Sequence, residues 1–156
     1  MTPESIQSYW QRFLATLPVD SPYHTAEYIA EGWGDGSPAM ADELGTLIAN
    51  GQKTASCSAL WDWEAEGKPI PGGGLITIVL DGQGAPLCIV ETTETVIRKY
   101  NEVDADFARA EGEGDLSLNF WRTAHKNFFS RTLPKIGREF SEELPVVCER
   151  FRVIYK

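Results

Sequence analysis

The sequence predicts a small α+β protein built around a β-barrel. At least four stretches have the composition or alternation of strands, and segments with helical periodicity lie between them. A chain of 156 residues, 42% of them hydrophobic, suits a single core. No shift in composition and no internal repeat indicates a boundary. We therefore expect one domain over residues 1–156.

Several segments have the features of helices. From Pro3 to Leu17 the apolar residues recur at i, i+3, i+4 and i+7, and Leu17-Pro18 ends the pattern. We expect this helix, within residues 1–22, to pack on the main body. Serine caps and a proline in the first turn support others. The further helices are expected at Thr25–Glu31, Ser37–Asn50, within Glu102–Asp115, and from Ser117 to about Ser130.

Strands are predicted where the period changes to two or where short apolar runs lie between turn residues. Asp81-Gly82-Gln83-Gly84 has the composition of a hairpin connection, which predicts two adjacent antiparallel strands. The predicted strands are Thr54–Leu60, Leu75–Leu80, Pro86–Val96 and Pro145–Tyr155.

The net charge of −9 argues against a protein that coats long polyanions, so we expect no extended binding to duplex DNA. The charge is uneven, however: residues 117–156 contain 8 Lys or Arg and 4 Asp or Glu. This basic quarter is either a solvated face or a place for a few phosphate contacts, and both interpretations stay open.

Composition also predicts the compartment and the absence of a metal. Three separated cysteines in apolar runs indicate reduced core residues and a cytoplasmic location. The longest apolar run, Leu75–Leu80, is too short to span a bilayer, and the N-terminus does not have the pattern of a signal peptide. With only two histidines and scattered cysteines, we expect no metal site and no cofactor.

The best candidate for chemistry is the segment Gly51-Gln52-Lys53-Thr54-Ala55-Ser56, where a helix ends and a strand begins. Lys53 lies where the partial negative charge of a helix end attracts an ammonium group. Glu91 shares its strand face with Leu87 and Ile89, so it is expected to point inward and to need a cation, for which we expect Lys53. Such a pair either activates a nearby hydroxyl or forms a structural salt bridge.

Three other features have both a structural and a functional interpretation. Trp61 either stacks on a base or belongs to the core. His125 shares a helical stripe with Trp121 and Phe128, which favours a packing role over acid–base catalysis. The acidic loop Glu111–Asp115 either binds a cation or caps the helix that follows it.

The order of these motifs resembles a known family. Three motifs show this resemblance: Gly51-x-Lys53-Thr54-x-Ser56 after a helix, the hairpin strand that reaches Glu91, and Glu111-Gly112-Glu113-Gly114-Asp115-x-Ser117 before Trp121-Arg122-x-x-His125. Together they resemble the ASCH domains, and more specifically the longer bacterial branch with an N-terminal helical extension. The resemblance covers roughly Tyr23 to Tyr155.

The resemblance implies a PUA-like β-barrel with a cleft and a role linked to RNA. Relatives include amidohydrolases that deacylate N4-acetylcytidine, and members with ribonuclease activity. It implies the catalytic set Lys53, Ser56 and Glu91, in which serine replaces the threonine of those amidohydrolases. The implied partner is single-stranded RNA or a modified nucleoside. The implied substrate-binding residues are Thr54, Trp61, Asp115, Ser117, Trp121, Arg122 and His125.

Three functional classes therefore remain after the sequence is considered. The first is a hydrolase, either a ribonuclease or an N4-acylcytidine amidohydrolase. The second is a non-catalytic RNA-binding regulatory module, and the third is a protein-interaction domain that keeps only the fold. The net charge favours a small ligand or a short RNA contact.

Overall fold

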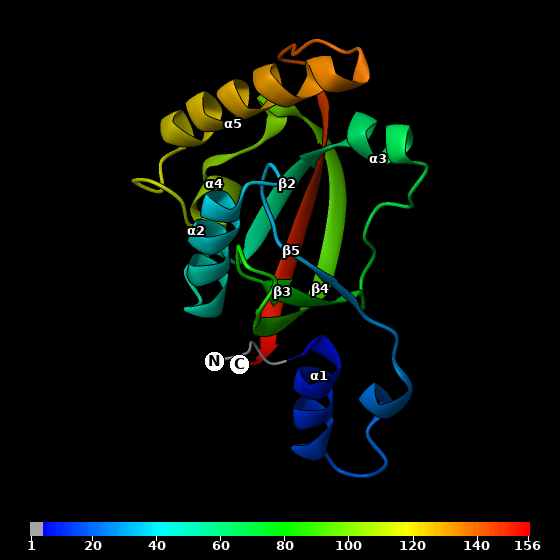
Figure 1. The fold of residues 1–156 in the computed structure, drawn as a ribbon. Coiled ribbons are helices and arrows are strands. Elements are labelled where there is room, and N and C mark those ends of the chain that lie inside the picture. The colour runs from blue at the N-terminus through cyan, green and yellow to red at the C-terminus, as the bar shows by residue number, and fades with distance from the viewer. Residues whose placement is uncertain (1–4) are drawn as a thin grey trace. The chain divides into compact units, whose positions relative to one another are not determined.

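A computed structural model describes residues 5–156 of the chain (Figure 1). Within these residues the protein is of the α+β class, as predicted, and its five strands hydrogen-bond in the order β1-β3-β4-β5-β2. The pairs β3–β4 and β2–β5 are antiparallel, whereas β1 and β3 are parallel. The strands are β1 (Ile29–Glu31), β2 (Ala55–Ala59), β3 (Ile76–Leu80), β4 (Pro86–Lys99) and β5 (Pro145–Tyr155).

The four predicted strands are confirmed as β2 to β5, whereas the helix expected at Thr25–Glu31 is wrong. A 3-10 turn, η1 (Pro22–Thr25), occupies its start, and β1 occupies its end. Ala30 and Glu31 instead pair with Ile78 and Val79 of β3. The ladder with a buried strand outweighs the weak local preference of a short helix.

The other predicted helices are confirmed, with small shifts of their ends. The predicted helix start at Pro3 lies outside the described residues. Leu60–Glu66 forms a helix that the sequence analysis did not predict. The α-helices are α1 (Ile6–Ala15), α2 (Pro38–Ala49), α3 (Leu60–Glu66), α4 (Ala105–Glu111) and α5 (Leu118–Thr132), and the remaining 3-10 turns are η2 (Tyr100–Glu102) and η3 (Leu133–Ile136).

The helix caps predicted from the sequence are present. The hydroxyl oxygen of Ser37 accepts a hydrogen bond from the Met40 amide at the start of α2, and that of Ser117 accepts one from Phe120 at the start of α5. Each satisfies an amide that has no partner inside its helix. Gly51 follows α2 with a positive φ of 82°, the left-handed conformation that ends many helices.

The described chain falls into two compact units. The first contains the residues up to Gly51 together with Gly74–Glu91 and Arg152–Lys156. The second contains Gln52–Gly73 and Thr92–Phe151. Each unit has a hydrophobic cluster of its own, and each is described separately below.

In the first unit, the N-terminal helix α1 packs its aromatic stripe on strands β3 and β4. Trp10 and Phe13 are buried there against Ile78 and Ile89. The ring of Trp10 stacks on that of Tyr28, with centroids 4.4 Å apart. Large aromatic side chains thus form a substantial part of the buried cluster of this unit.

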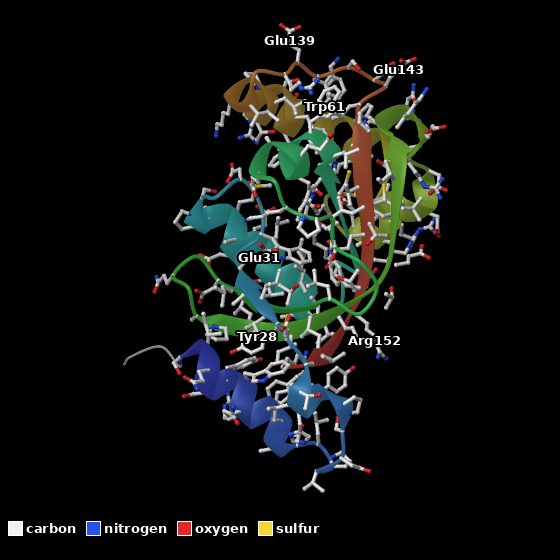
Figure 2. The ribbon with its side chains drawn as sticks, turned by 90° about the vertical axis from the view of Figure 1, so that its right-hand side faces the viewer. Tyr28, Glu31, Trp61, Glu139, Glu143 and Arg152 are labelled. Carbon is white, nitrogen blue, oxygen red and sulfur yellow. The ribbon has the colours of Figure 1, made fainter. Side chains whose placement is uncertain are left out.

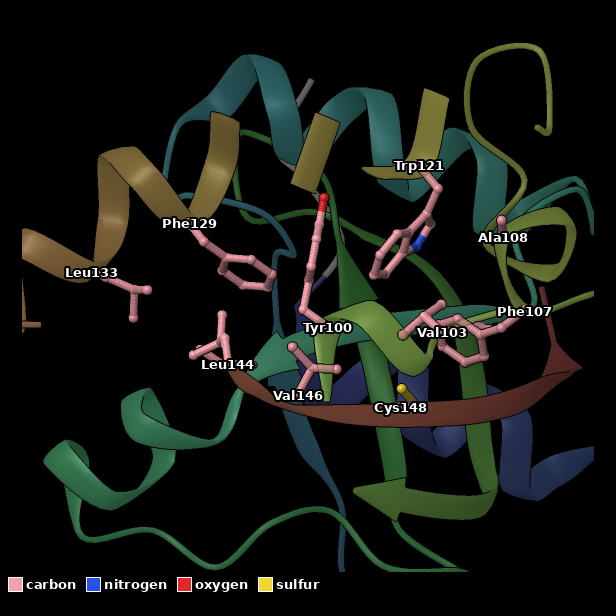
Figure 3. Close-up of a cluster of buried hydrophobic side chains, with 12 residues drawn as sticks. Tyr100, Val103, Phe107, Ala108, Trp121, Phe129, Leu133, Leu144, Val146 and Cys148 are labelled. Atoms are coloured by element: carbon pink, nitrogen blue, oxygen red, sulfur yellow. The ribbon is translucent and has the colours of Figure 1, made fainter. Parts of the chain in front are cut away.

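In the second unit, α5 covers a cluster of apolar side chains from η2, α4 and β5 (Figure 3). Tyr100, Trp121 and Phe129 form its aromatic part, and none of the three is more than 4% exposed. Ala55 and Ala59 of β2 belong to the same cluster, so one face of β2 points into it. This core fixes the positions of β2, α4 and α5, which carry the site described below.

Within residues 5–156, no helix is long and apolar enough to cross a membrane. The three cysteines are free thiols, and Cys88 and Cys148 are buried among apolar residues, as expected.

Candidate functional site

The side chain of Lys53 is buried, with only 2% of its surface exposed. Its Nζ donates a hydrogen bond to the Glu113 carboxylate at 3.0 Å and a longer one, of 3.5 Å, to the main-chain carbonyl of Glu111. A lysine is rarely buried to this extent unless a carboxylate and further acceptors replace its water. The structure supplies both kinds of partner.

Residues 52–54 bond to the carbonyls at the C-terminal end of α4. The amide and the hydroxyl of Thr54 both donate to the carbonyl of Ala110, at 2.7 and 3.1 Å. The side-chain amide of Gln52 donates to the carbonyl of Gly112 at 2.7 Å. The last carbonyls of a helix have no partner within it, so this segment satisfies them. The cation of Lys53 also suits the negative end of the helix.

Gly112 makes this close approach possible. Its φ is 71°, and a Cβ atom there would lie 2.2 Å from the carbonyl oxygen of Gln52. Any side chain would therefore push the two backbone segments apart.

Glu111 is buried beside Lys53 and accepts two side-chain hydrogen bonds on one oxygen. Its Oε2 lies 2.9 Å from Trp121 Nε1 and 2.9 Å from His125 Nε2. Burial by itself would raise the pKa of Glu111, but the charges of Lys53 and His125 and the hydrogen bonds from His125 and Trp121 lower that pKa below its ordinary value.

His125 stacks on Trp121 with ring centroids 4.1 Å apart and an angle of 19° between the planes. Its Nδ1 lies 2.9 Å from the Trp121 carbonyl oxygen, and its Nε2 faces the Glu111 carboxylate. The carbonyl oxygen can only accept, so Nδ1 donates to it, and Nε2 donates to the Glu111 carboxylate when the ring is protonated. Burial would lower the pKa of His125, but Glu111 raises it above its ordinary value.

These five residues form what we call the Lys53 network: Lys53, Glu111, Glu113, Trp121 and His125. The network places the Lys53 ammonium and the His125 ring beside two carboxylates, of which Glu113 is 25% exposed. The helical stripe of His125 favours a packing role, and its stacked, hydrogen-bonded ring fits that role. Glu111 and Glu113, the partners of Lys53, were not predicted, although they lie in the acidic Glu111–Asp115 loop.

The predicted pairing of Lys53 with Glu91 is wrong. Lys53 pairs with Glu113 in the second unit. Glu91, in the first unit, is 20% exposed and accepts hydrogen bonds from the hydroxyl of Tyr23 and the guanidinium of Arg152, each at 2.8 Å. Glu91 therefore has the cation that its half-buried position requires, at the end of β5 where Figure 2 labels Arg152.

Ser56 and Cys57 are neighbours on β2 and point to opposite faces of the sheet. The register pairs Ser56 with Glu149 and Cys57 with Cys148. The side chain of Cys57 points to the core face of β2. Burial, the hydrogen bond with Cys148 and the charge of Glu111 raise the pKa of Cys57, whereas the charge of Lys53 lowers it. Successive residues of a regular strand alternate, so the hydroxyl of Ser56 lies on the other face. No hydrogen bond joins Ser56 to Lys53 in residues 5–156.

The remaining predicted residues lie elsewhere in the second unit. The Asp115 carboxylate accepts a hydrogen bond from the amide of Ser117, the residue that caps α5. Hydrogen bonds from Ser117 lower the pKa of Asp115. The guanidinium of Arg138 lies 4.6 Å from the ring centre of Trp61, which Figure 2 labels on α3. Arg122 lines an open cavity in the second unit. Within the described chain, no group of three or more His, Cys, Asp or Glu residues is arranged to hold a metal ion.

Comparisons with known proteins agree with this architecture. An ASCH domain family model matches residues 31–155. The crystal structure of an ASCH domain from Lactobacillus crispatus JV V101 is 35% identical, with a TM-score of 0.89 over 96% of this chain and 94% of that one. A protein from Enterococcus faecalis V583 is also 35% identical, with a TM-score of 0.83 over 96% and 88% of the two chains.

A hypothetical protein at 14% identity and a TM-score of 0.51, aligned over 82% of this chain and all of that one, shares the fold. No curated protein matched the sequence. The chain therefore has the PUA-like fold, which is an RNA-binding fold. Within that fold class, the chain belongs to the ASCH domain family, as its motifs predicted.

A charge-deletion variant tests whether Lys53 holds the network together. We expect Lys53→Met to lower the free energy of unfolding by about 3 kcal/mol, because it leaves buried acceptors without their cation. Lys68→Met is the matched control, since Lys68 pairs with Glu66 while 65% exposed and such pairs contribute at most about 1 kcal/mol. Urea unfolding of both variants gives the comparison. Equal losses would show that the Lys53 pair contributes no more than a surface pair.

The Glu111–His125 pair predicts how stability depends on pH. The pKa of Glu111 is lowered by folding, so its contribution is present above about pH 4.3 and is lost as the pH falls through the folded pKa. The pKa of His125 is raised, so its contribution is complete below about pH 6.5 and is lost as the pH rises through the folded pKa. Lys53, Glu113 and Cys57 also face this pair.

We therefore expect the pair to stabilise the protein most between these two limits. In His125→Phe, which keeps an aromatic ring but no titrating group, the decline of stability above about pH 6.5 should be smaller than in the wild type. Thermal melts across this pH range measure it. Parallel curves for the two proteins would mean that His125 is not the group responsible.

Proposed function

We propose that this ASCH domain binds single-stranded RNA or a modified nucleoside and hydrolyses it, with the Lys53 ammonium receiving a negatively charged oxygen of the substrate. One observation carries this proposal: the ammonium is 2% exposed, yet the carboxylate that pairs with it is 25% exposed. A substrate oxygen that replaces the Glu113 carboxylate would contact a cation that has already lost its hydration. Electrostatic interactions are strong in such a buried environment.

The backbone around Glu113 is compatible with such an exchange. Gly112 and Gly114 flank it with φ of 71° and 60°, and Leu116 has a φ of 68°, which is uncommon for a residue with a side chain. Backbone in such conformations concentrates at functional sites. Glu113 would turn to solvent while Glu111 and His125 keep the base of the site in place.

A ribonuclease is the version of this function that the contacts favour. Lys53 would stabilise the charge that develops on the phosphate as the strand is cut, and no covalent intermediate on serine is needed. The orientation of Ser56 supports this version. Cys57 points to the face of β2 where Lys53 and Glu111 lie, so Ser56 points to the other face. The cytoplasm is the expected location, in keeping with three free thiols.

An N4-acylcytidine amidohydrolase is the second candidate, and the presence of Lys53, Ser56 and Glu91 at the family positions favours it. The Ser56 hydroxyl would attack the acyl carbonyl and lose its proton to Lys53 in its neutral amine form. That proton would pass to N4 of the cytidine as it leaves, and water would then release the acyl group from Ser56. Glu149 is a further candidate base, because it lies directly across from Ser56 in the β2–β5 pair. A non-catalytic RNA-binding module is the alternative to both versions.

Substitutions at two positions separate these functions. The assay offers labelled single-stranded RNA and a panel of N4-acylated cytidines, at a temperature where every variant is folded. For a ribonuclease, Lys53→Ala should reduce the rate about a hundredfold or more, while Ser56→Ala should cost little. For an amidohydrolase, Ser56→Ala should abolish the activity and Ser56→Thr should retain most of it. Activity that survives both alanine variants would refute catalysis by these residues.

The salt dependence of RNA binding tests how short the contact is. We expect RNA binding to weaken gently as ionic strength rises. A chain of net charge −9 has few cations to place on phosphates and therefore displaces few counterions from the RNA. Binding constants measured over a range of KCl concentrations give the slope. A slope that corresponds to about six or more phosphates would instead identify an extended RNA track.

A further inference from the structure

A second place in the molecule has the features of a ligand site. It is an open cavity of about 310 Å³ in the second unit, and none of its residues hydrogen-bonds to the Lys53 ammonium. Its size is at the lower end of the range, about 300 to 1,000 Å³, of small-molecule sites. We call it the Tyr100 pocket; its lining residues are Tyr100, Asn101, Arg122, Thr123, Lys126 and Glu142.

The floor of the Tyr100 pocket is fixed by the core. The amides of Tyr100 and Asn101 donate to the carbonyls of Leu144 and Glu142, at 2.7 and 3.0 Å, which ties η2 to the segment before β5. The Tyr100 hydroxyl donates to the main-chain carbonyl of Arg122 on α5. Its ring packs edge-on against Phe140, with centroids 4.9 Å apart. The floor of the cavity is therefore fixed before a ligand binds, which lowers the entropy lost on binding.

Two cations from α5 line one side of the pocket. Arg122 and Lys126 are one helical turn apart, so their side chains project from the same face. Neither forms a salt bridge with a carboxylate within residues 5–156. An arginine fork beside a lysine suits the oxygens of a phosphate group.

Glu142 makes the pocket unsuitable for a bare anion. Its carboxylate would repel a second negative group, but it accepts hydrogen bonds from neutral hydroxyls. A ribose presents two adjacent hydroxyls, and a carboxylate is a common partner of the 2′-hydroxyl in nucleotide sites. Asn101 and Thr123 add groups that both donate and accept. The lining thus combines a phosphate-binding side with a sugar-binding side.

We propose that the Tyr100 pocket binds a ribose phosphate, as a free ribonucleotide or as the terminal nucleotide of an RNA strand. The ring of Tyr100 is 4% exposed, so it offers no free face on which a base could stack. Recognition is through the phosphate and the sugar and is independent of the base. This site is separate from the Lys53 network, and binding there requires no hydrolysis.

Binding of adenosine 5′-monophosphate to the intact chain, followed by calorimetry, tests the site. We expect it to bind at least about tenfold more tightly than 2′-deoxyadenosine 5′-monophosphate, adenosine or inorganic phosphate, since each lacks one of the required charged or hydroxyl contacts. A similar affinity for the four compounds would overturn the proposal. Comparable binding of the cytidine and guanosine monophosphates is expected, and strong preference for one base would also contradict it.

Variants locate the binding. Lys126→Ala and Arg122→Ala should each weaken the ribonucleotide about tenfold or more, and Glu142→Gln should reduce the preference for ribose over deoxyribose. Lys135→Ala is the matched control, because Lys135 is an exposed cation on η3 that does not line the pocket. If the control weakens binding as much as Lys126→Ala, the effect is general charge and the site is refuted.

Two further ligands distinguish the sources of the ribose phosphate. RNA with a 5′-phosphate that binds more tightly than the same RNA with a 5′-hydroxyl, with the difference lost in Lys126→Ala, identifies a strand terminus. Equal binding of the two RNAs, with mononucleotide binding intact, identifies a free nucleotide. Because these ligands need not be cut, a chain that fails every hydrolase assay can still pass this test.

Discussion

The ammonium of Lys53 has almost no contact with water, and much of the second unit is arranged to compensate for this. The carbonyls at the end of α4, the carboxylates of Glu111 and Glu113, and the ring of His125 all take part in one set of contacts. A buried charge is costly unless partners replace its hydration, so each member restricts the others. The close approach at Gly112 is the geometric condition for the whole arrangement.

The same constraint links stability to the proposed function. A fully satisfied Lys53 would be only structural, but one of its two acidic neighbours, Glu113, reaches solvent on a loop of unusual backbone conformation. The Tyr100 pocket differs in this respect, because its cations already face an open cavity. Lys53 would thus need Glu113 to move before it could contact a ligand, whereas Arg122 and Lys126 would not need such a rearrangement.

The regular pairing of β2 with β5 decides which side chains can act together. Because the strand continues without a bulge from Ala55 to Ala59, Cys57 takes the core face and Ser56 the other. Of the residues grouped by the resemblance, Lys53 pairs with Glu113 and Glu91 pairs with Arg152. Ser56 lies across from Glu149 in the register of the two strands. The joint catalytic role of the three residues stays a prediction.

The sequence by itself determined the fold class, most helices and strands, and the family. These follow from local chemistry: caps at Ser37 and Ser117, apolar runs between turn residues, and motif order. Tertiary structure alone decided that Glu111 and Glu113 balance Lys53, that Arg152 balances Glu91, and that Ile29–Glu31 is a strand. Each depends on segments far apart in the chain, and many carboxylates could satisfy one lysine. Periodicity specifies which face a side chain takes, whereas packing specifies its partner.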